Sequence, residues 1–271
     1  MRFFIPTYKR SEYIPTLSYW PADLPIALIV RPEEERAYRA YVKQFFASYQ
    51  IAVIPAAVEA GISFVRNACI TLAGNEKFMM FDDDLELLVR KHDHAWKLRG
   101  MEYGDVHEMA EEVEDALDRY AHVGISMREG NNRILDESVE NARMIRATAY
   151  HGGVLQSAGL RFDRRFDTKE DLEFTLRLLS MGFANLVFYC FAQGQGKSDA
   201  PGGCNAQYDR TVEQMREKAQ LLALTYPHCV KVTEKATIGA WGGGTRPEVR
   251  IYWKKAFQNR GFLTESEDED E

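Results

Sequence analysis

The sequence contains few cysteines, and none of them stand at metal-binding spacing. Cys69, Cys190, Cys204 and Cys229 are the only four in 271 residues, and no two form a Cys-x-x-Cys motif. Four isolated cysteines indicate neither a zinc site nor a disulfide framework. A reducing cytoplasm is therefore the expected compartment.

The sequence also lacks a long apolar run. No stretch reaches the roughly eighteen apolar residues that a membrane-spanning helix needs. The first twenty residues carry Arg2, Lys9 and Arg10 without the apolar centre of a signal peptide. We therefore expect a soluble, unexported protein with no membrane partner. Because 45% of the residues are hydrophobic, the chain can bury the core of one large α/β domain.

Excess charge of one sign is nearly absent outside the C-terminal end. The formal net charge is -7, but residues 265–271 carry six of the 41 acidic side chains. The preceding 264 residues are therefore close to neutral, and their charge does not exclude a nucleic-acid partner. A terminal block of like charge is typical of a solvated segment, so residues 265–271 are predicted to be a disordered acidic tail.

Short apolar runs alternate with amphipathic stretches along the chain. Expected strands are 3–5, 26–30, 51–54, 78–81, 122–127 and 185–191, and expected helices are 33–49, 62–72, 106–120, 168–181 and 208–226. This alternation predicts an α/β fold with a mostly parallel sheet covered by helices. Ligands of such sheets collect beyond the carboxyl ends of the strands. Residues 7–10, Arg31 and the residues after 81 should therefore line one crevice.

Three consecutive aspartates follow the fourth of these strands. Residues 78–81 lead directly into Asp82, Asp83 and Asp84. Three adjacent like charges repel one another, and a helix cap or turn needs only one carboxylate. A bound cation therefore explains the cluster better than an acidic turn does. Carboxylate oxygens are hard ligands, which favours Mg²⁺ or Mn²⁺ over zinc.

Three further motifs accompany the aspartates in a fixed order. Residues 5–10 read Ile-Pro-Thr-Tyr-Lys-Arg, residues 61–67 read Gly-Ile-Ser-Phe-Val-Arg-Asn, and a Glu-Asp pair at 170–171 opens a predicted helix. Over about residues 1–190, these motifs resemble those of GT-A-fold glycosyltransferases. Within that superfamily the chain is most similar to the phage TET/JBP-associated glycosyltransferases. Those proteins are associated with sugar transfer to hydroxymethylated pyrimidines in DNA.

The resemblance implies a single GT-A-like, Rossmann-related domain over residues 1–264, with a mixed, mostly parallel sheet. Residues 1–100 form the nucleotide-sugar half and residues 101–264 the acceptor half. A UDP-sugar is the implied donor, and a hexose or N-acetylhexosamine is the group transferred. Such a transfer requires a cation that neutralises the charge growing on the leaving diphosphate, and this agrees with the acidic strand end.

The resemblance also assigns the donor-binding residues. Asp84 is expected to bind the metal, while Asp82 and Asp83 are shared between the metal and the nucleotide. The remaining nucleotide contacts are expected from Thr7, Arg10, Arg66 and Asn67. A guanidinium fork such as that of Arg66 suits a diphosphate, although a surface arginine on a helix is the simpler alternative.

The expected catalytic residues are Asp171 and Glu170. An inverting transfer requires a base, because a hydroxyl is a poor nucleophile until its proton is removed. The resemblance assigns this role to Asp171, with Glu170 orienting the base or binding the acceptor. Acidic residues also stabilise the first turn of any helix, so the position of the pair after the aspartate motif is what favours catalysis.

Two segments are candidates for the acceptor and for a lid. Residues 193–205 are glycine-rich, with Gly202 and Gly203, and Lys197 is available for a phosphate of the donor or of DNA. Near the C-terminus, cations and aromatics alternate in a pattern suited to an extruded base, although an ordinary edge strand explains that pattern equally well. The candidates in this second segment are Arg250, Trp253 and Lys254.

Other functions remain open at this stage. The same catalytic half would serve a protein, a glycan or a small-molecule acceptor. A non-catalytic module that binds sugar nucleotides or modified DNA is also possible, although Asp171 argues against it. Aspartate-based phosphoryl transfer is disfavoured because Leu85 and Glu86, rather than a Thr/Val pair, follow the acidic motif. No histidine is assigned as a ligand, and the oligomeric state stays undetermined.

Overall fold

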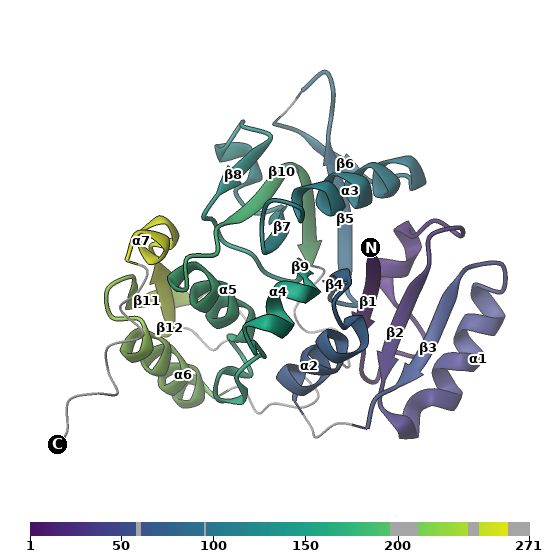
Figure 1. Ribbon diagram of the computed structural model, residues 1–271, viewed down its shortest axis with the longest axis horizontal. Helices are drawn as coiled ribbons and strands as arrows, with labels where there is room; N and C mark the ends of the chain where they lie inside the picture. The colour runs from purple at the N-terminus through teal and green to yellow at the C-terminus, as the bar shows by residue number, and fades with distance from the viewer. Residues whose placement is uncertain (58–60, 95, 196–210, 238–243, 260–271) are drawn as a thin grey trace.

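The protein is described here by a computed structural model that covers residues 1–57, 61–94, 96–195, 211–237 and 244–259. A large sheet runs through the molecule, and helices cover both of its faces (Figure 1). The strands of this sheet are β1 (Arg2–Pro6), β2 (Ile26–Val30), β3 (Ile51–Pro55), β4 (Lys77–Phe81), β5 (Leu85–Arg90), β6 (Leu98–Gly100), β7 (His122–Met127), β8 (Ser138–Glu140), β9 (Ala147–His151) and β10 (Asn185–Gln195).

The helices vary from six to fourteen residues in length. They are α1 (Glu35–Phe45), α2 (Ile62–Ala73), α3 (Tyr103–Ala116), α4 (Gly152–Ser157), α5 (Glu170–Ser180), α6 (Val212–Thr225) and α7 (Trp253–Gln258). A second, two-stranded sheet joins β11 (Val230–Thr237) to β12 (Gly244–Ile251). Among the helices described, none has the length and apolar character to cross a membrane.

The strand order of the large sheet is β3-β2-β1-β4-β9-β7-β10-β5-β6, with β8 paired to β10. Strands β1 to β4 are parallel to one another, and β6, β7 and β10 point the same way. Strands β5, β8 and β9 run in the opposite direction. The predicted mixed, mostly parallel sheet flanked by helices is therefore confirmed.

Alternation along β1 divides the core into two layers. Phe3 and Ile5 point to the face covered by α1 and α3, whereas Phe4 points to the face covered by α2, α4 and α5. All three side chains are buried. Because both faces of this strand are covered, the strand is apolar from Phe3 to Pro6, as expected for the parallel part of a sheet.

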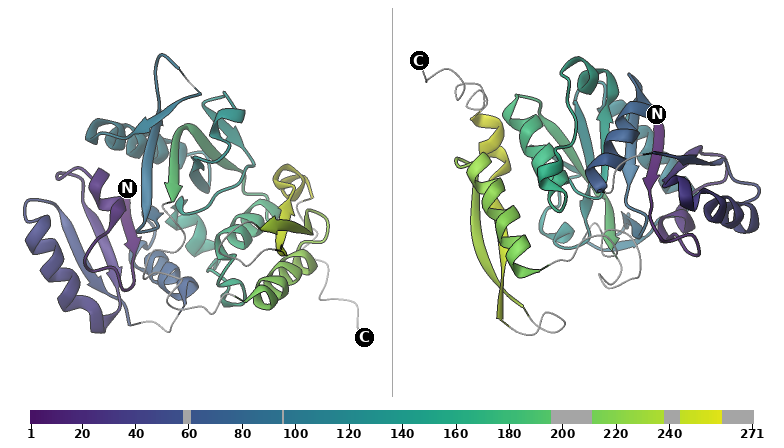
Figure 2. Two further views of the ribbon diagram at one scale, coloured as in Figure 1. Left: turned by 180° about the vertical axis from the view of Figure 1, so that it is seen from behind. Right: turned by 90° about the horizontal axis from the view of Figure 1, so that it is seen from below.

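Helix α5 is buried on two sides. Phe174 and Leu178 pack toward the large sheet, while Leu172, Leu176 and Leu179 pack against α6, α7 and the small sheet. Figure 2 shows β11, β12 and α7 beside α5 and α6, on the side of the molecule away from β2 and β3. The C-terminal elements therefore rest on α5, and α5 rests on the large sheet.

Several sequence-based boundaries were wrong. The predicted C-terminal strand ends at Ile251, because Trp253 begins α7, where its side chain packs into the cluster beside α5. Strand β10 extends to Gln195, so the predicted loop at 193–205 begins later than expected. Lys197, Gly202 and Gly203 lie outside the described residues, as does the acidic tail at 265–271.

His122 is fully buried at the start of β7. Its Nε2 lies 3.0 Å from the carbonyl oxygen of Phe183, so this nitrogen donates a hydrogen bond and the ring is neutral. No hydrogen-bond partner within the described residues reaches Nδ1. Burial lowers the pKa of His122 to about 4, because an imidazolium could not be hydrated there.

We expect His122 to make the protein less stable in acid. Between pH 6.5 and 4 the unfolded chain takes up a proton that the native state does not, so the free energy of unfolding falls as the pH falls through this window. The loss reaches about 3 kcal/mol. Denaturant unfolding at several pH values should show a smaller loss for His122→Gln than for the wild type. Parallel stability curves for the two proteins would contradict the assignment.

Candidate active site

A cavity of about 420 Å³ opens beyond the carboxyl ends of β1, β2 and β4. Residues from both halves of the chain line it, and seven acidic and six basic side chains contribute to the wall. Such a mixture suits a ligand that carries negative charge together with a cation. The charged lining residues are Arg10, Arg31, Arg66, Asp82, Asp83, Asp84, Arg143, Arg146, Asp167, Lys169, Glu170, Asp171 and Glu248.

Asp83 is held in a dense hydrogen-bond network at the end of β1. The Thr7 hydroxyl donates to its Oδ2 at 2.7 Å, and the Arg10 guanidinium pairs with its Oδ1. Tyr38 braces both partners, because its hydroxyl lies 3.0 Å from Thr7 Oγ1 and accepts from the Arg10 backbone N–H at 2.9 Å. Burial raises the pKa of Asp83 to about 6, although Arg10 and Thr7 oppose that shift. Both oxygens of Asp83 are thus engaged, and the residue positions the loops that follow β1 and β4.

Asp84 retains a free coordinating oxygen. Its Oδ2 accepts from Gln195 Nε2 at 3.0 Å and lies 3.0 Å from the Arg10 guanidinium. Its Oδ1 is buried and has no hydrogen-bond partner among the described residues. A buried carboxylate oxygen without a partner is costly unless a cation or water occupies its other side. Asp84 therefore fits the role of a metal ligand.

The described residues do not form a complete metal cage from protein side chains alone. No group of three or more His, Cys, Asp or Glu side chains in these residues has the arrangement needed to hold an ion. Mg²⁺ and similar hard cations are often held by one or two carboxylates together with substrate phosphates and water. The geometry around Asp84 agrees with a site of that kind, in which Asp82 or the donor supplies further oxygens.

Arg66 connects the aspartate cluster to α5. It is 3% exposed, and its Nη2 lies 3.1 Å from Asp82 Oδ1 and 3.3 Å from Glu170 Oε1. Removal from water raises the pKa of both carboxyl groups, and the arginine charge opposes this. The Nε and Nη1 atoms of Arg66 are buried without a hydrogen-bond partner in the described residues. Arg66 is therefore a buried cation between two acids, and not a surface arginine.

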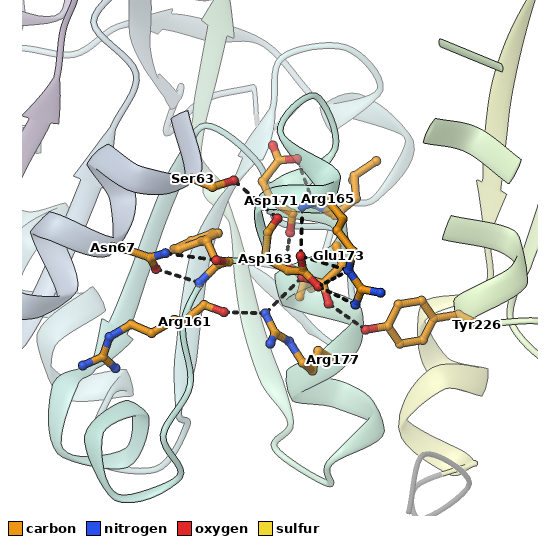
Figure 3. A network of polar contacts seen from close by, with 12 residues as sticks. Ser63, Asn67, Arg161, Asp163, Arg165, Asp171, Glu173, Arg177 and Tyr226 are labelled. Atoms are coloured by element: carbon orange, nitrogen blue, oxygen red, sulfur yellow. Dashed lines mark hydrogen bonds and ion pairs between the residues drawn. The ribbon is translucent and has the colours of Figure 1, made fainter. Parts of the chain in front are cut away.

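Asp171 follows Glu170 at the start of α5 and also lines the cavity. Its Oδ1 accepts a hydrogen bond from the Leu172 N–H at 2.8 Å, which restricts the orientation of the carboxylate. Two residues further along, Glu173 accepts from the Tyr226 hydroxyl at 2.9 Å and from Arg177 at 3.1 Å (Figure 3). This network fixes α5 against the end of α6.

Asn67, predicted to bind the nucleotide, is not among the residues that line the cavity. Its side-chain Nδ2 donates to the Phe162 carbonyl at 3.0 Å, and its Oδ1 accepts from the Phe162 N–H at 2.7 Å (Figure 3). Both ends of the amide are thus used by one backbone segment. Asn67 ties α2 to the chain that leads into α5, while its neighbour Arg66 faces the acids.

The C-terminal candidates are also absent from the cavity wall. Arg250 lies in β12 and is exposed, Lys254 is exposed on α7, and Trp253 packs into the core beside α5. Glu248 of β12 lines the cavity in their place. The small sheet therefore reaches the site through a residue that the sequence analysis did not select.

Several other lining residues were missed. Arg143 and Arg146 come from the loop before β9, Lys169 immediately precedes α5, and Gln195 ends β10. Lys169 adjoins the Glu-Asp pair and could have been found from that position. Gln195 lies within the 193–205 segment, although it was not singled out there. Arg143 and Arg146 are far in sequence from every motif, and the long-range pairing of β4 with β9 brings their loop to the aspartates.

The fold is the GT-A fold seen in solved glycosyltransferase structures. Similar solved structures include S. aureus TarS 1-349 in complex with UDP-GlcNAc, with a TM-score of 0.52 and 14% identity over 83% of this chain and 66% of that chain. The mannosyltransferase PcManGT from Pyrobaculum calidifontis, in complex with GDP-Man and Mn²⁺, gives a TM-score of 0.51 and 12% identity over 73% of this chain and 57% of that chain. The chain thus spans less than two thirds of either structure.

The particular family follows from the sequence. The sequence model of the TET-Associated Glycosyltransferase family matches residues 1–203, and this chain belongs to that family. It is also similar to the "Beta-glucosyl-HMC-alpha-glucosyl-transferase" of Enterobacteria phages T6 and T2. Identity with each is 27% over 237 residues, which cover 80% of this chain and 81% of the relative. The chain is a glycosyltransferase, as the motifs indicated.

Asn67→Ala tests the structural assignment of Asn67. We expect a loss of about 1–3 kcal/mol in the free energy of unfolding, because the N–H and carbonyl of Phe162 lose their partners. The affinity for UDP, measured by calorimetry, should be unchanged under conditions where the variant is folded. Thr71→Ala, at an exposed position one turn further along α2, is the control. A large loss of UDP affinity in Asn67→Ala would restore the nucleotide-binding role.

Proposed function

We propose that this protein transfers a hexose or N-acetylhexosamine from a UDP-sugar, with Mn²⁺ or Mg²⁺ at the active site, to a hydroxyl group on a modified pyrimidine in phage DNA. The favoured acceptor base is 5-hydroxymethylcytosine or 5-hydroxymethyluracil. Residues 1–100 serve the donor and residues 101–264 the acceptor. The proposed setting is the cytoplasm of a bacterial or phage-infected cell.

The unpartnered Oδ1 of Asp84 carries this proposal. Asp84 lines a cavity at the ends of β1, β2 and β4, and its other oxygen, Oδ2, lies 3.0 Å from the Arg10 guanidinium. A divalent cation would neutralise the carboxylate, and the phosphates of a nucleoside diphosphate would neutralise the arginine. Two proteins of the same fold were solved with nucleotide sugars: S. aureus TarS with UDP-GlcNAc, and PcManGT with GDP-Man and Mn²⁺. These complexes support a donor of this class.

The residues of the cavity then divide the work of transfer. Asp84, together with Asp82, would hold the cation, and the chemistry that a bound cation supplies is neutralisation of charge on the departing diphosphate. Thr7 and Arg10 position the aspartate cluster, and through it the donor. Arg66 keeps Asp82 and Glu170 at a fixed separation, because its Nη2 lies within 3.3 Å of both.

Asp171 is the proposed base for an inverting transfer. Its carboxylate takes the proton of the acceptor hydroxyl while the hydroxyl oxygen forms the new glycosidic bond and the sugar–phosphate bond of the donor breaks. UDP leaves with the electron pair of that bond. The buried Glu170, paired with Arg66, then orients the start of α5, on which Asp171 stands.

The names of the relatives favour a second acceptor within the same class. The name of the phage T6 and T2 proteins contains two glucosyl groups together with HMC, which indicates an acceptor that already carries a sugar. A glucosylated hydroxymethylcytosine in DNA would offer this protein a sugar hydroxyl in place of the hydroxymethyl group. Protein or small-molecule acceptors, and binding without transfer, are the remaining alternatives.

Mass spectrometry of nucleosides tests the reaction. DNA containing hydroxymethylcytosine, hydroxymethyluracil or β-glucosylated hydroxymethylcytosine should gain a hexose or N-acetylhexosamine mass after incubation with the protein, Mn²⁺ and a panel of UDP-sugars. Asp84→Asn should lower the rate by at least about a hundredfold, because a neutral amide is a poor ligand for a hard cation. Asp93→Asn, which removes the same charge at an exposed turn, is the matched control. Metal-dependent hydrolysis of UDP-sugar without any gain in DNA mass would redirect the search to other acceptors.

Asp171→Asn tests the proposed base. A lost general base should reduce kcat by about 10² to 10⁴. Metal-dependent UDP affinity should stay near the wild-type value, because among the described residues no hydrogen bond or ion pair joins the Asp171 side chain to the aspartate cluster. Single-turnover kinetics and calorimetry separate the two effects. A wild-type kcat in Asp171→Asn would exclude the residue as the base.

A further inference from the structure

The loop between β8 and β9 is a rigid element of the cavity wall. At one end, the side chain of Asn185 clamps it, since Oδ1 accepts from the Ala142 N–H and Nδ2 donates to the Ala142 carbonyl, both at 2.9 Å. At the other end, the Arg146 carbonyl accepts from the Asp82 N–H at 2.8 Å. Arg143 lies between these two anchors and lines the cavity.

The backbone of this loop is strained at both anchors. Asn141 has φ 52° and Arg146 has φ 64°, in the left-handed region that residues other than glycine seldom adopt. Strain of this kind persists only where the surroundings over-determine the conformation, and it is frequent at binding sites. The loop thus adopts an unfavourable backbone conformation that places Arg143 beside α5.

Three cations from three separate elements meet on this side of the cavity. Lys169 precedes α5, Arg143 comes from the β8–β9 loop, and Arg246 comes from β12. Burial lowers the pKa of Lys169, the charges of Glu248 and Asp171 oppose this shift, and the smaller effects of Arg143 and Arg246 add to it. Both arginine charges therefore lie close enough to Lys169 to influence it.

The nearby acids Glu248 and Asp171 offset part of this positive charge. Glu248 lies 3.8 Å from Arg246, on the same strand, and Asp171 is the proposed base. Within the described residues, no hydrogen bond or ion pair engages the side chains of Arg143 and Lys169. Like charges brought together at a cavity wall repel one another, and a bound anion would remove that repulsion.

We infer that Arg143 and Lys169, with Arg246 beside them, form a phosphate subsite for the backbone of the acceptor DNA. This inference rests on the proposed function and specifies how its acceptor is held. Phosphate contacts position a nucleic acid without reading its sequence. The subsite would thus place the strand so that the modified base reaches Asp171.

The position of the subsite favours the acceptor over the donor as the source of the phosphate. Its residues come from the β8–β9 loop, α5 and β12, whereas the ends of β1 and β2 supply Thr7, Arg10 and Arg31 on the donor side. Figure 1 shows β12 and α5 on one side of β4, and β1 and β2 on the other. Asp84, the proposed metal ligand, belongs to the end of β4.

Salt-dependent DNA binding tests the inference with Arg143→Gln/Lys169→Gln. The probes are fluorescein-labelled duplexes that differ only in carrying cytosine or hydroxymethylcytosine, titrated at several NaCl concentrations. We expect about a tenfold loss of affinity for both duplexes, and a decrease of about one in the slope of log K against log salt. Calorimetry with UDP and Mn²⁺ should give the wild-type affinity.

The matched control is Arg36→Gln/Lys43→Gln, which removes one arginine and one lysine from exposed positions on α1. It should leave the affinity for DNA and the salt slope unchanged. The single variant Arg143→Gln controls for misfolding of the double variant. Arg143 is exposed, so its loss should leave the thermal unfolding temperature near that of the wild type.

The possible outcomes separate the subsite from the function. Wild-type transfer to DNA with unchanged DNA affinity in the variants would overturn the subsite and leave the proposed function standing. Weaker UDP binding with unchanged DNA binding would assign the cations to the donor diphosphate and also overturn it. A wild-type protein that hydrolyses UDP-sugar but neither binds nor modifies any of the DNA substrates would overturn both.

Discussion

The site depends on one buried arginine. Arg66 lies between Asp82, at the end of β4, and Glu170, at the start of α5. Removing one partner from such a buried arrangement typically costs about 3–5 kcal/mol, because an uncompensated charge remains in a poorly hydrated place. The same contact joins the end of β4 to the start of α5. The position of Asp171 relative to Asp84 is therefore set by electrostatics as well as by packing.

Around this contact, the acidic cluster divides into three roles. Asp83 is saturated by Thr7 and Arg10, Asp82 is tied to Arg66, and Asp84 keeps one oxygen without a partner. Three adjacent carboxylates thus differ because each meets a different neighbour. A single run of identical residues can supply a positioning group, a bridge and a metal ligand.

The sequence predicted the parts of this protein that local chemistry determines. The strands before Thr7 and Asp82 were recognisable because they are apolar throughout, and the Glu-Asp pair was found because it opens a helix of regular period. Strands β5, β8 and β9 were missed, since they are antiparallel insertions whose burial comes from distant partners. Arg143 could not be found for the same reason, and the position of Asn67 away from the cavity wall could not be foreseen, because sequence proximity to Arg66 does not reveal which side of the helix faces the cavity.

The two-sided burial of α5 limits how this fold can be recombined. The family match ends at residue 203, yet elements within residues 211–237 and 244–259 pack on α5 through Leu172, Leu176 and Leu179. A chimera that exchanged only the C-terminal segment with that of a relative would place a foreign surface against these leucines. Helix α5, which carries Asp171, therefore forms one packing unit with the C-terminal segment. A chimera that exchanges this segment must also exchange the residues on the outer face of α5.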